Sequence, residues 1–319
     1  MKIAFIGHSV AIRNCIEILQ HTPNEVVAIF THPKEGHQRD LAIYEERKEL
    51  FGDYAYDVFD AFDDYGIPVI EYQDLSQKTE IDQLKSYDPQ AVITVGCRDI
   101  LKANFIEQFE HVFNLHPYFL PYYRGAGIDS WLILQGQSPS TQYATCHYIS
   151  PRIDAGKIIA TLPYAVPENA KPIDIFKVRM DTLGPLLIKA LDNITSDQPV
   201  YSEQDESQSM YYPRLNTLRD GKIEFSQWGG QEISLFIRAF SYPYEGAWFL
   251  LNAEKVHVHE SSFTPLKNIH PYGVGLIVRK DTTGIFVMVK DGLIKISALV
   301  QNGDDFDLKK IKIGKRICS

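Results

Sequence analysis

Short apolar runs alternate with helix-length segments along the first half of the chain. Five runs rich in β-branched and other apolar residues predict buried strands, at residues 2–7, 25–31, 67–72, 90–95 and 112–115. Residues 11–19 and 80–87 have the spacing of amphipathic helices, and an acidic stretch that ends at Tyr65 also predicts helix. Strands that alternate with helices predict an α/β fold, a Rossmann-like, mostly parallel sheet with helices on both faces. Ligands of such sheets bind at the carboxyl ends of the strands, so we expect a site in the loops after residues 7, 31, 95 and 115.

The pattern changes after a long predicted helix, Ile173–Ile194. Residues 196–212 are polar and predict a linker. Beyond it, apolar residues recur at helical spacing from Ile233 to Phe240, and five short β runs follow, at residues 247–251, 255–259, 274–278, 284–289 and 293–296. One helix and about five short strands predict a small β-barrel-like, OB-like domain. We therefore expect two domains, residues 1–205 and residues 206–319.

Composition and charge narrow the class of protein. Of the 319 residues, 45% are hydrophobic and 23% charged, which excludes a largely disordered chain and a membrane bundle. The net charge is −9, and residues 201–319 are nearly neutral, so neither half has the basic excess of a module that binds nucleic acid or anionic lipid. No 18-residue apolar stretch predicts a membrane span, and the four cysteines lack Cys-x-x-Cys spacing. We expect a cytoplasmic protein with no membrane partner.

Three local motifs do not support a function of their own. Gly7-His8-Ser9 follows the first strand but lacks the G-x-G-x-x-G spacing of a dinucleotide site. His257 and His259 share a strand face without an evident third ligand, so we expect no metal. Cys97 follows a strand end, but the spacing suggests no base for it, which favours a buried or incidental thiol.

The segment from Phe113 to Gly156 carries the candidate chemistry. Asn114 and His116 are two residues apart at the end of a strand, so their side chains point the same way. Asp154 follows in a turn between two strand-like runs. Such a trio suits acyl transfer to an amine: the histidine accepts a proton, the asparagine N–H stabilises the developing oxyanion, and the aspartate holds the imidazolium. From residue types alone, a polar loop without catalytic function is the more common interpretation.

The same segment resembles the folate-dependent formyltransferase family. The resemblance rests on Asn114-Leu115-His116, on the Leu-Pro-Tyr-Tyr-Arg-Gly loop at 120–125, and on Asp154-Ala155-Gly156, and it extends to residues 211–214, 220–223 and 237–246. It covers nearly the whole chain. The resemblance implies transfer of a formyl group from N10-formyltetrahydrofolate to a primary amine, without a metal. It implies catalytic roles for Asn114, His116 and Asp154, a formyltransferase catalytic domain over residues 1–205, and an associated β domain over 206–319.

The resemblance also implies where the two substrates bind. The pterin is expected beside the loop after the fourth strand, at Gly96, Cys97, Arg98, Asp99, Ile100 and Leu101. The acceptor is expected at His8, Ser9, His32, Tyr122, Arg124 and Gly125. A salt bridge or an exposed loop cation is an equally good interpretation of Arg124, and packing is the more ordinary interpretation of Tyr122. The residues after the family's histidine also depart from its usual pattern, here Tyr118-Phe119, which bears on the acceptor more than on the chemistry.

Three branches of the family differ in the amine that they formylate. Glycinamide-ribonucleotide formyltransferases lack a second domain. Methionyl-tRNA formyltransferases must hold a polyanion, which the charge of this chain disfavours despite a basic segment at 309–316. Residues 30–32, 113–116 and 123–125 look most like the sugar-modifying members. The expectation is a sugar N-formyltransferase of polysaccharide biosynthesis that acts on a nucleotide-linked amino-deoxysugar and has no nucleic-acid partner. The resemblance to the sugar-modifying members also implies a homodimer. The alternatives are a methionyl-tRNA formyltransferase and a non-catalytic relative that binds folate or a sugar nucleotide.

Overall fold

The computed structural model describes residues 1–37, 42–43 and 45–317, and it divides the chain into two compact units that interleave in sequence. The first unit contains residues 1–126, 141–165 and 176–212, and the second contains residues 127–140, 166–175 and 213–319. The predicted division into domains at residue 205 stays a prediction.

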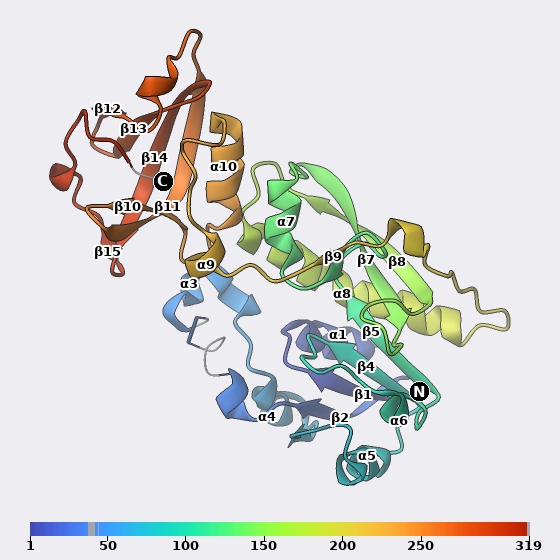
Figure 1. The fold of residues 1–319 in the computed structure, drawn as a ribbon. Helices are drawn as coiled ribbons and strands as arrows, with labels where there is room; N and C mark the ends of the chain where they lie inside the picture. The colour runs from blue at the N-terminus through green and yellow to red at the C-terminus, as the bar shows by residue number, and fades with distance from the viewer. Residues whose placement is uncertain (38–41, 44, 318–319) are drawn as a thin grey trace. The chain divides into compact units, whose positions relative to one another are not determined.

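The first unit is built on a seven-stranded sheet, in the order β3-β2-β1-β4-β5-β7-β8 (Figure 1). The strands are β1 (Lys2–Gly7), β2 (Glu25–Thr31), β3 (Val69–Glu71), β4 (Ala91–Val95), β5 (His111–His116), β7 (Ser140–Tyr148) and β8 (Ile158–Val166). The first five pair in parallel, and β7 pairs antiparallel with β5. The predicted Rossmann-like sheet is therefore confirmed, and the strand-like runs on either side of Asp154 are β7 and β8.

Helices cover this sheet because the central strands are apolar on both faces. Ala4 and Ile6 of β1 pack with Ile81, Leu84 and Phe105 from the helices that follow β3 and β4. Connections between parallel strands are right-handed, so the β1–β2 and β3–β4 connections, which run in opposite directions along the sheet, lie on opposite faces. The helices with described ends in the first 126 residues are α1 (Ala11–Leu19), α3 (Lys48–Phe51), α4 (Ala61–Tyr65), α5 (Lys78–Lys85) and α6 (Ala103–Ile106).

A long helix and a short two-stranded sheet complete the description of this part of the chain. α8 (Pro172–Ile194) contacts α1, because the Asn14 side chain donates a hydrogen bond to the Met180 carbonyl over 3.3 Å. Two residues each form β6 (Arg124–Gly125) and β9 (Tyr211–Tyr212), which pair in parallel. None of the helices in the described residues has the length and apolar composition that a membrane span requires.

The prediction of a long acidic helix that ends at Tyr65 is wrong over its described residues. The segment instead contains α3, two 3-10 turns and α4. Gly52 has a φ of +55°, which ends α3, and Asp57 is extended and accepts a hydrogen bond from the Phe59 amide to begin the next turn. Residues 38–41 and 44 lie outside the described residues.

The predicted linker is also wrong over residues 202–212. Ser202 forms a bridge with Ile158 at the start of β8, and residues 211–212 form β9. The polar composition of residues 202–212 correctly predicts that most of their side chains are exposed. It does not predict the backbone hydrogen bonds by which this segment pairs with other parts of the first unit.

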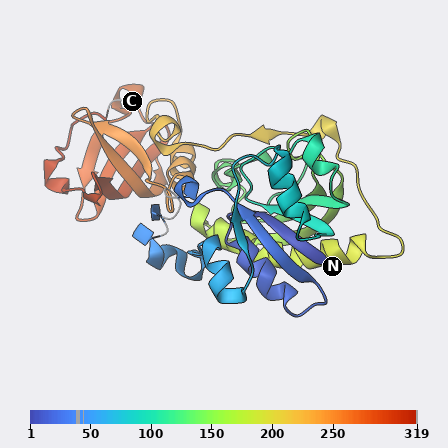
Figure 2. The ribbon, with the colours of Figure 1, turned by 90° about the horizontal axis from the view of Figure 1, so that it is seen from below.

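The second unit contains an antiparallel sheet in the order β10-β11-β14-β13-β12, with β15 beside β14. Its strands are drawn in orange to red in Figure 2. The strands are β10 (Ala247–Leu251), β11 (Glu254–Pro265), β12 (Ile277–Lys280), β13 (Gly284–Val289), β14 (Gly292–Gln301) and β15 (Asp304–Asp305). The helices with described bounds are α7 (Ile128–Leu134), α9 (Thr217–Asp220) and α10 (Gly230–Ala239). The predicted helix after Ile233 is confirmed as α10, and its apolar face is buried at Ile233, Phe236 and Ile237.

Two predicted strands of this unit, 255–259 and 293–296, are too short, and a third is displaced. Residues 274–275 form a turn in which Gly275 has a φ of +85°, and Leu276 forms only an isolated bridge before β12. A left-handed residue does not continue a strand, so β12 begins two residues later. The antiparallel sheet with a covering helix nevertheless confirms the predicted β domain.

The sheet of the first unit brings the loops after β1 and β4 together at its carboxyl edge. β1 and β4 are neighbours, although the chain leaves β1 toward β2 on the other side, which is the switch point at which ligands bind in such folds. Gly7 has a φ of +140°, and a Cβ on it would lie 2.0 Å from the Val95 carbonyl oxygen. Gly7 therefore allows the first loop to pass directly over the end of β4.

We expect Gly7→Ala to lower the free energy of unfolding by about 2 kcal/mol or more, because the new methyl group would overlap a backbone carbonyl that cannot move aside. Urea unfolding followed by circular dichroism measures this change. Gly36→Ala is the matched control, since its Cβ would lie 3.7 Å from the Cβ of His32, an ordinary contact. Equal stabilities of the two variants would contradict the prediction.

Candidate active site

β5 and β7 place two predicted side chains, Asn114 and His116, and one further side chain, His147, on one face of the sheet. Asn114 and His116 lie at the end of β5, and the antiparallel register sets Asn114 opposite His147 of β7. Facing residues of adjacent strands have neighbouring side chains, so His147 joins the predicted pair. His116 and His147 are buried, with 4% and 2% of their surfaces exposed.

The third predicted residue, Asp154, reaches this face from the turn between β7 and β8. Its φ is +50°, a left-handed conformation that aspartate tolerates better than most residues. One carboxylate oxygen, Oδ2, accepts a hydrogen bond from the Gly125 amide over 2.9 Å. The other, Oδ1, lies 3.9 Å from His116 Nδ1 and 3.7 Å from His147 Nε2. The structure therefore brings Asn114, His116 and Asp154 together, as the sequence predicts.

The hydrogen bonds around His147 fix the orientation of the Asn114 amide. A carbonyl oxygen can only accept, so His147 Nδ1 carries a proton and donates it to the Tyr148 carbonyl over 2.8 Å. The unprotonated Nε2 then accepts from Asn114 Nδ2 over 3.2 Å, while the Thr94 hydroxyl donates to Asn114 Oδ1 over 2.8 Å. Among the residues that the structure describes, the second N–H of this amide has no acceptor, which leaves a fixed donor for a substrate.

The same argument assigns the tautomer of His116. Its Nε2 lies 2.7 Å from the Tyr123 carbonyl oxygen and must donate to it. In the neutral ring the lone pair is therefore on Nδ1, the atom that faces the Asp154 carboxylate. A neutral imidazole with its basic nitrogen beside a carboxylate can accept a proton and be stabilised as an imidazolium.

His147 is kept neutral. Burial is the largest cause that lowers its pKa, to about 4; the neighbouring His116 lowers it further and the Asp154 carboxylate opposes the shift. A neutral His147 is required for the network above, because a proton on Nε2 would remove the acceptor of the Asn114 amide. His147 and Thr94 are not among the predicted site residues, although a polar residue within a buried strand is a signal that the sequence contains.

The predicted pterin loop follows β4 and meets the loop after β2. Gly96 has a φ of +67°, and a Cβ on it would lie 3.2 Å from the Ser9 Cβ, so the loops after β1 and β4 also touch. Asp99 Oδ2 lies 3.7 Å from His32 Nε2. Cys97 donates to the Asp99 carbonyl, and burial raises the pKa of its thiol to about 11, which leaves it protonated at neutral pH.

The other residues of this loop face different surroundings. Arg98 donates to the Gly36 carbonyl over 2.6 Å, so its guanidinium joins the loops after β2 and β4. Ile100 is 63% exposed and Leu101 is buried. The loop thus combines left-handed backbone with an exposed apolar side chain, and its role in binding the pterin stays a prediction.

Several of the predicted acceptor residues form contacts within the protein itself. Ser9 Oγ accepts from the Ala11 amide at the start of α1, and the partly exposed Tyr122 ring lies 5.2 Å from that of Phe119. Arg124 is 8% exposed, and its guanidinium binds Gln204 and Glu206. The salt-bridge interpretation of Arg124 describes what the structure shows, and acceptor binding by these residues, with His8, His32 and Gly125, stays a prediction. In the described part of the chain, no group of three or more His, Cys, Asp or Glu is arranged to hold a metal ion.

Comparison with known proteins identifies the class. The formyl transferase family model matches residues 1–180, and the model of the formyl transferase C-terminal domain matches residues 217–314. The chain belongs to the formyl transferase family and is a formyltransferase. A methionyl-tRNA formyltransferase from Acidobacterium capsulatum is 25% identical over 261 residues, which cover 81% of this chain and 79% of that protein.

Solved structures share the fold over nearly the whole chain. WlaRD, a sugar 3N-formyl transferase solved in the presence of dTDP and 5-N-formyl-THF, has a TM-score of 0.64 at 18% identity and covers 93% of this chain and 97% of its own. The N-formyltransferase from Helicobacter canadensis, in complex with folinic acid and dTDP-3-aminofucose, has a TM-score of 0.65 at 19% identity and covers 94% and 100%.

The lowered pKa of His147 predicts a pH-dependent stability. An unfolded histidine takes up its proton near pH 6.5, whereas folded His147 takes it up near pH 4, so the unfolded state binds more protons between these values. The free energy of unfolding should therefore fall by up to about 3 kcal/mol through this residue as the pH drops from 6.5 to 4.

Urea unfolding at a series of pH values measures this contribution as a difference between variants. His147→Gln should show a shallower decline than the wild type over this range, because it removes the titrating group. His21→Gln removes an exposed histidine and should follow the wild type. Parallel curves for all three proteins would contradict the assignment of a low pKa to His147.

Proposed function

We propose that this formyltransferase transfers a formyl group from N10-formyltetrahydrofolate to the amino group of a nucleotide-linked amino-deoxysugar. The observation that carries the proposal is the grouping of Asn114, His116 and Asp154 at the carboxyl edge of the sheet. Asp154 Oδ1 lies within 4 Å of the His116 and His147 rings, and His147 accepts a hydrogen bond from the Asn114 amide. The choice of acceptor is supported by the full-length fold shared with two sugar N-formyltransferases, one of them solved with dTDP-3-aminofucose.

The loop after β4 fits a folate. Gly96 has a φ of +67°, which lets this loop turn beside Ser9 at the carboxyl edge of the sheet, where ligands of such folds bind. The exposed side chain of Ile100 offers an apolar contact beside it. Residues 96–101 would hold the donor, which supplies an activated formyl group when bound. Two of the structural relatives were solved with 5-N-formyl-THF or folinic acid, which supports this assignment.

The residues of the site have separate roles in this reaction. His116 Nδ1 takes the proton that the acceptor amine loses as it attacks, and the Asp154 carboxylate 3.9 Å away stabilises the resulting imidazolium. The remaining N–H of Asn114 donates to the oxygen that becomes negative, a contribution of about 3 kcal/mol for one such donor. Thr94 and His147 hold the Asn114 amide in the orientation that this requires. The new bond between the amine and the formyl carbon replaces the bond from that carbon to N10 of the folate, which takes up a proton and leaves as tetrahydrofolate. No covalent bond to the protein is needed.

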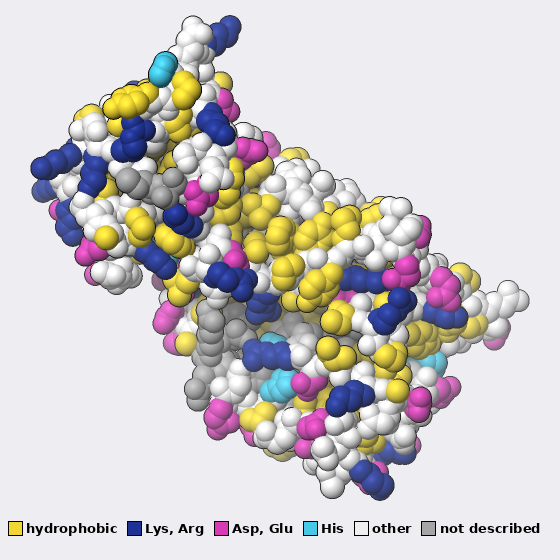
Figure 3. Space-filling view, in the orientation of Figure 1, with side chains coloured by type: hydrophobic (Ala, Val, Ile, Leu, Met, Phe, Trp, Pro, Cys, Tyr) yellow, Lys and Arg dark blue, Asp and Glu magenta, His cyan; other side chains and the backbone are white. Residues whose placement is uncertain are grey.

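A methionyl-tRNA acceptor is the second candidate, and a specific observation favours it. The curated relative from Acidobacterium capsulatum is a methionyl-tRNA formyltransferase. Lysine and arginine side chains are spread over the visible face of the second unit in Figure 3, where acidic side chains stand among them. The net charge of −9 still disfavours this acceptor, because phosphate contacts from basic residues supply much of the affinity for RNA.

The remaining assignments follow from the sugar acceptor. We propose that the enzyme works in the cytoplasm, in polysaccharide biosynthesis, and as a homodimer. A non-catalytic relative is a weaker interpretation, because a protein that only binds folate or a sugar nucleotide has no need of a histidine whose basic nitrogen faces a carboxylate.

A mass-spectrometric transfer assay tests the proposal. The protein is mixed with N10-formyltetrahydrofolate and, in parallel, with dTDP-, UDP- and GDP-linked 3- and 4-amino-deoxysugars and with unformylated methionyl-tRNA. We expect one sugar nucleotide to gain the mass of a formyl group, and His116→Ala to lower the rate by ~10²- to 10⁴-fold, because it removes the general base.

His21→Ala, an exposed histidine, is the matched control and should keep the wild-type rate. Formylation of the tRNA alone would replace the sugar acceptor by the second candidate. The absence of transfer to every acceptor, together with tight binding of tetrahydrofolate, would favour the non-catalytic relative.

A further inference from the structure

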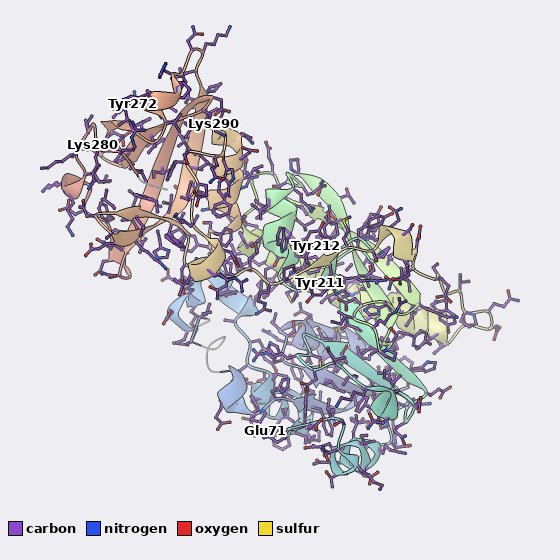
Figure 4. The ribbon with its side chains drawn as sticks, viewed as in Figure 1. Glu71, Tyr211, Tyr212, Tyr272, Lys280 and Lys290 are labelled. Atoms are coloured by element: carbon purple, nitrogen blue, oxygen red, sulfur yellow. The ribbon has the colours of Figure 1, made fainter. Side chains whose placement is uncertain are left out.

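Residues 202–212, here called the strap, connect the two loops of the active site. Ser202 and Ile158 exchange two backbone hydrogen bonds, of 2.8 and 3.0 Å, at the start of β8. At its other end, the strap pairs with the loop after His116 through β9 and β6, and the Arg124 amide donates to the Met210 carbonyl. Figure 4 labels Tyr211 and Tyr212 on this end of the strap.

Gln204 lies within the strap, and both the nitrogen and the oxygen of its side-chain amide form hydrogen bonds. Its Nε2 donates to the carbonyl oxygens of Asp154 and Gly156, both over 2.8 Å. Its Oε1 accepts from Arg124 Nη2 over 2.8 Å and from Arg124 Nε over 3.3 Å. Carbonyls only accept and a guanidinium only donates, so these four partners allow one orientation of the amide.

These contacts join the two pieces of chain that hold the Asp154 carboxylate. One piece is the turn itself, in which Asp154 has a left-handed φ that a free loop would not hold in place. The other is the Arg124-Gly125 segment, whose Gly125 amide binds Asp154 Oδ2. Gln204 therefore forms hydrogen bonds with the backbone of the Asp154 turn. It also forms hydrogen bonds with Arg124, the residue before Gly125, whose amide binds the Asp154 carboxylate.

Glu206 strengthens the same connection from the surface. Its carboxylate pairs with Arg124 over 2.8 Å and with Arg152 over 3.1 Å, and Arg152 is two residues before Asp154. The Glu206 side chain is 43% exposed, so water screens these pairs and they contribute little alone. The Arg124–Gln204 contact is the more buried one, since Gln204 is partly buried whereas Glu206 is exposed.

We propose that Gln204 is a positioning residue of the formyl transfer reaction, which fixes the turn so that the Asp154 carboxylate faces His116. This inference rests on the proposed function. Gln204 touches the backbone of Asp154 and none of the atoms that exchange the proton. Its loss therefore affects the rate of the chemical step through Asp154, while the donor site on residues 96–101 keeps its own contacts.

Three variants separate this role from a general effect on folding. Gln204→Ala removes all four hydrogen bonds. Gln204→Glu keeps an acceptor for Arg124 but removes both N–H donors to the turn. Gln208→Ala is the matched control, because Gln208 is an exposed glutamine of the same strap whose side chain donates to the Ser207 hydroxyl over 3.4 Å.

Steady-state kinetics with the acceptor identified by the transfer assay give the first readout. We expect Gln204→Ala and Gln204→Glu to lower kcat by ~10- to 100-fold, because a small displacement of an acid–base group costs rates of this order. The KM for N10-formyltetrahydrofolate should stay within about twofold, and Gln208→Ala should match the wild type. A wild-type kcat in Gln204→Glu would overturn the proposal, as would a loss of kcat and of donor affinity together.

Hydrogen–deuterium exchange gives a second readout that needs no acceptor. In Gln204→Ala and Gln204→Glu, exchange should be faster in peptides that span residues 150–157, and unchanged in peptides of β1 and β4. Faster exchange in a protein that transfers no formyl group would mean that the positioning is real and the proposed function is wrong. Unchanged exchange in the turn would overturn the positioning role, whatever the activity.

Discussion

The hydrogen bond from the Gly125 amide to Asp154 Oδ2 is the interaction on which the geometry of the candidate active site depends. Asp154 lies in a turn beyond the edge of the parallel sheet, whereas His116 ends a strand inside it. The amide holds one carboxylate oxygen over 2.9 Å, and this directs the other oxygen toward both imidazoles. Gly125 serves this purpose because its φ is +105° and a Cβ would lie 2.2 Å from the Tyr212 carbonyl oxygen. The strap can therefore pack directly against the residue that orients the carboxylate.

The part of the site that local patterns determine was predictable from sequence. Asn114 and His116 share a face because strand residues alternate, and they lie at the ligand-binding edge because the sheet is parallel. Both conclusions needed only the apolar run before them. The first five strands were predictable for the same reason, since strands buried on both faces are continuously apolar.

The rest of the site depends on pairings that are distant in sequence. His147 reaches Asn114 only through the antiparallel register of β5 and β7, and a shift of one residue would turn it to the other face. Gln204 follows Asp154 by 50 residues and lies in a segment whose polar composition indicates a linker. Composition reports that such a segment is exposed, but not which carbonyl groups it satisfies. The long acidic helix failed for a related reason, because Gly52 interrupts it by a backbone conformation that charge patterning does not reveal.

The charges of the site limit how many of its two histidine rings can carry a positive charge. One carboxylate lies within 4 Å of both rings, and it can balance one buried positive charge but not two. The hydrogen bonds decide which ring that is. His147 is held by the Tyr148 carbonyl and by the Asn114 amide, and a second proton would break the latter contact and leave a charge on a ring that is only 2% exposed. His116 is held only through Nε2, so its Nδ1 can gain a proton without the loss of a hydrogen bond. The neutral ring thus keeps the Asn114 amide in place, and the other ring is the one that can take up a proton in the proposed reaction.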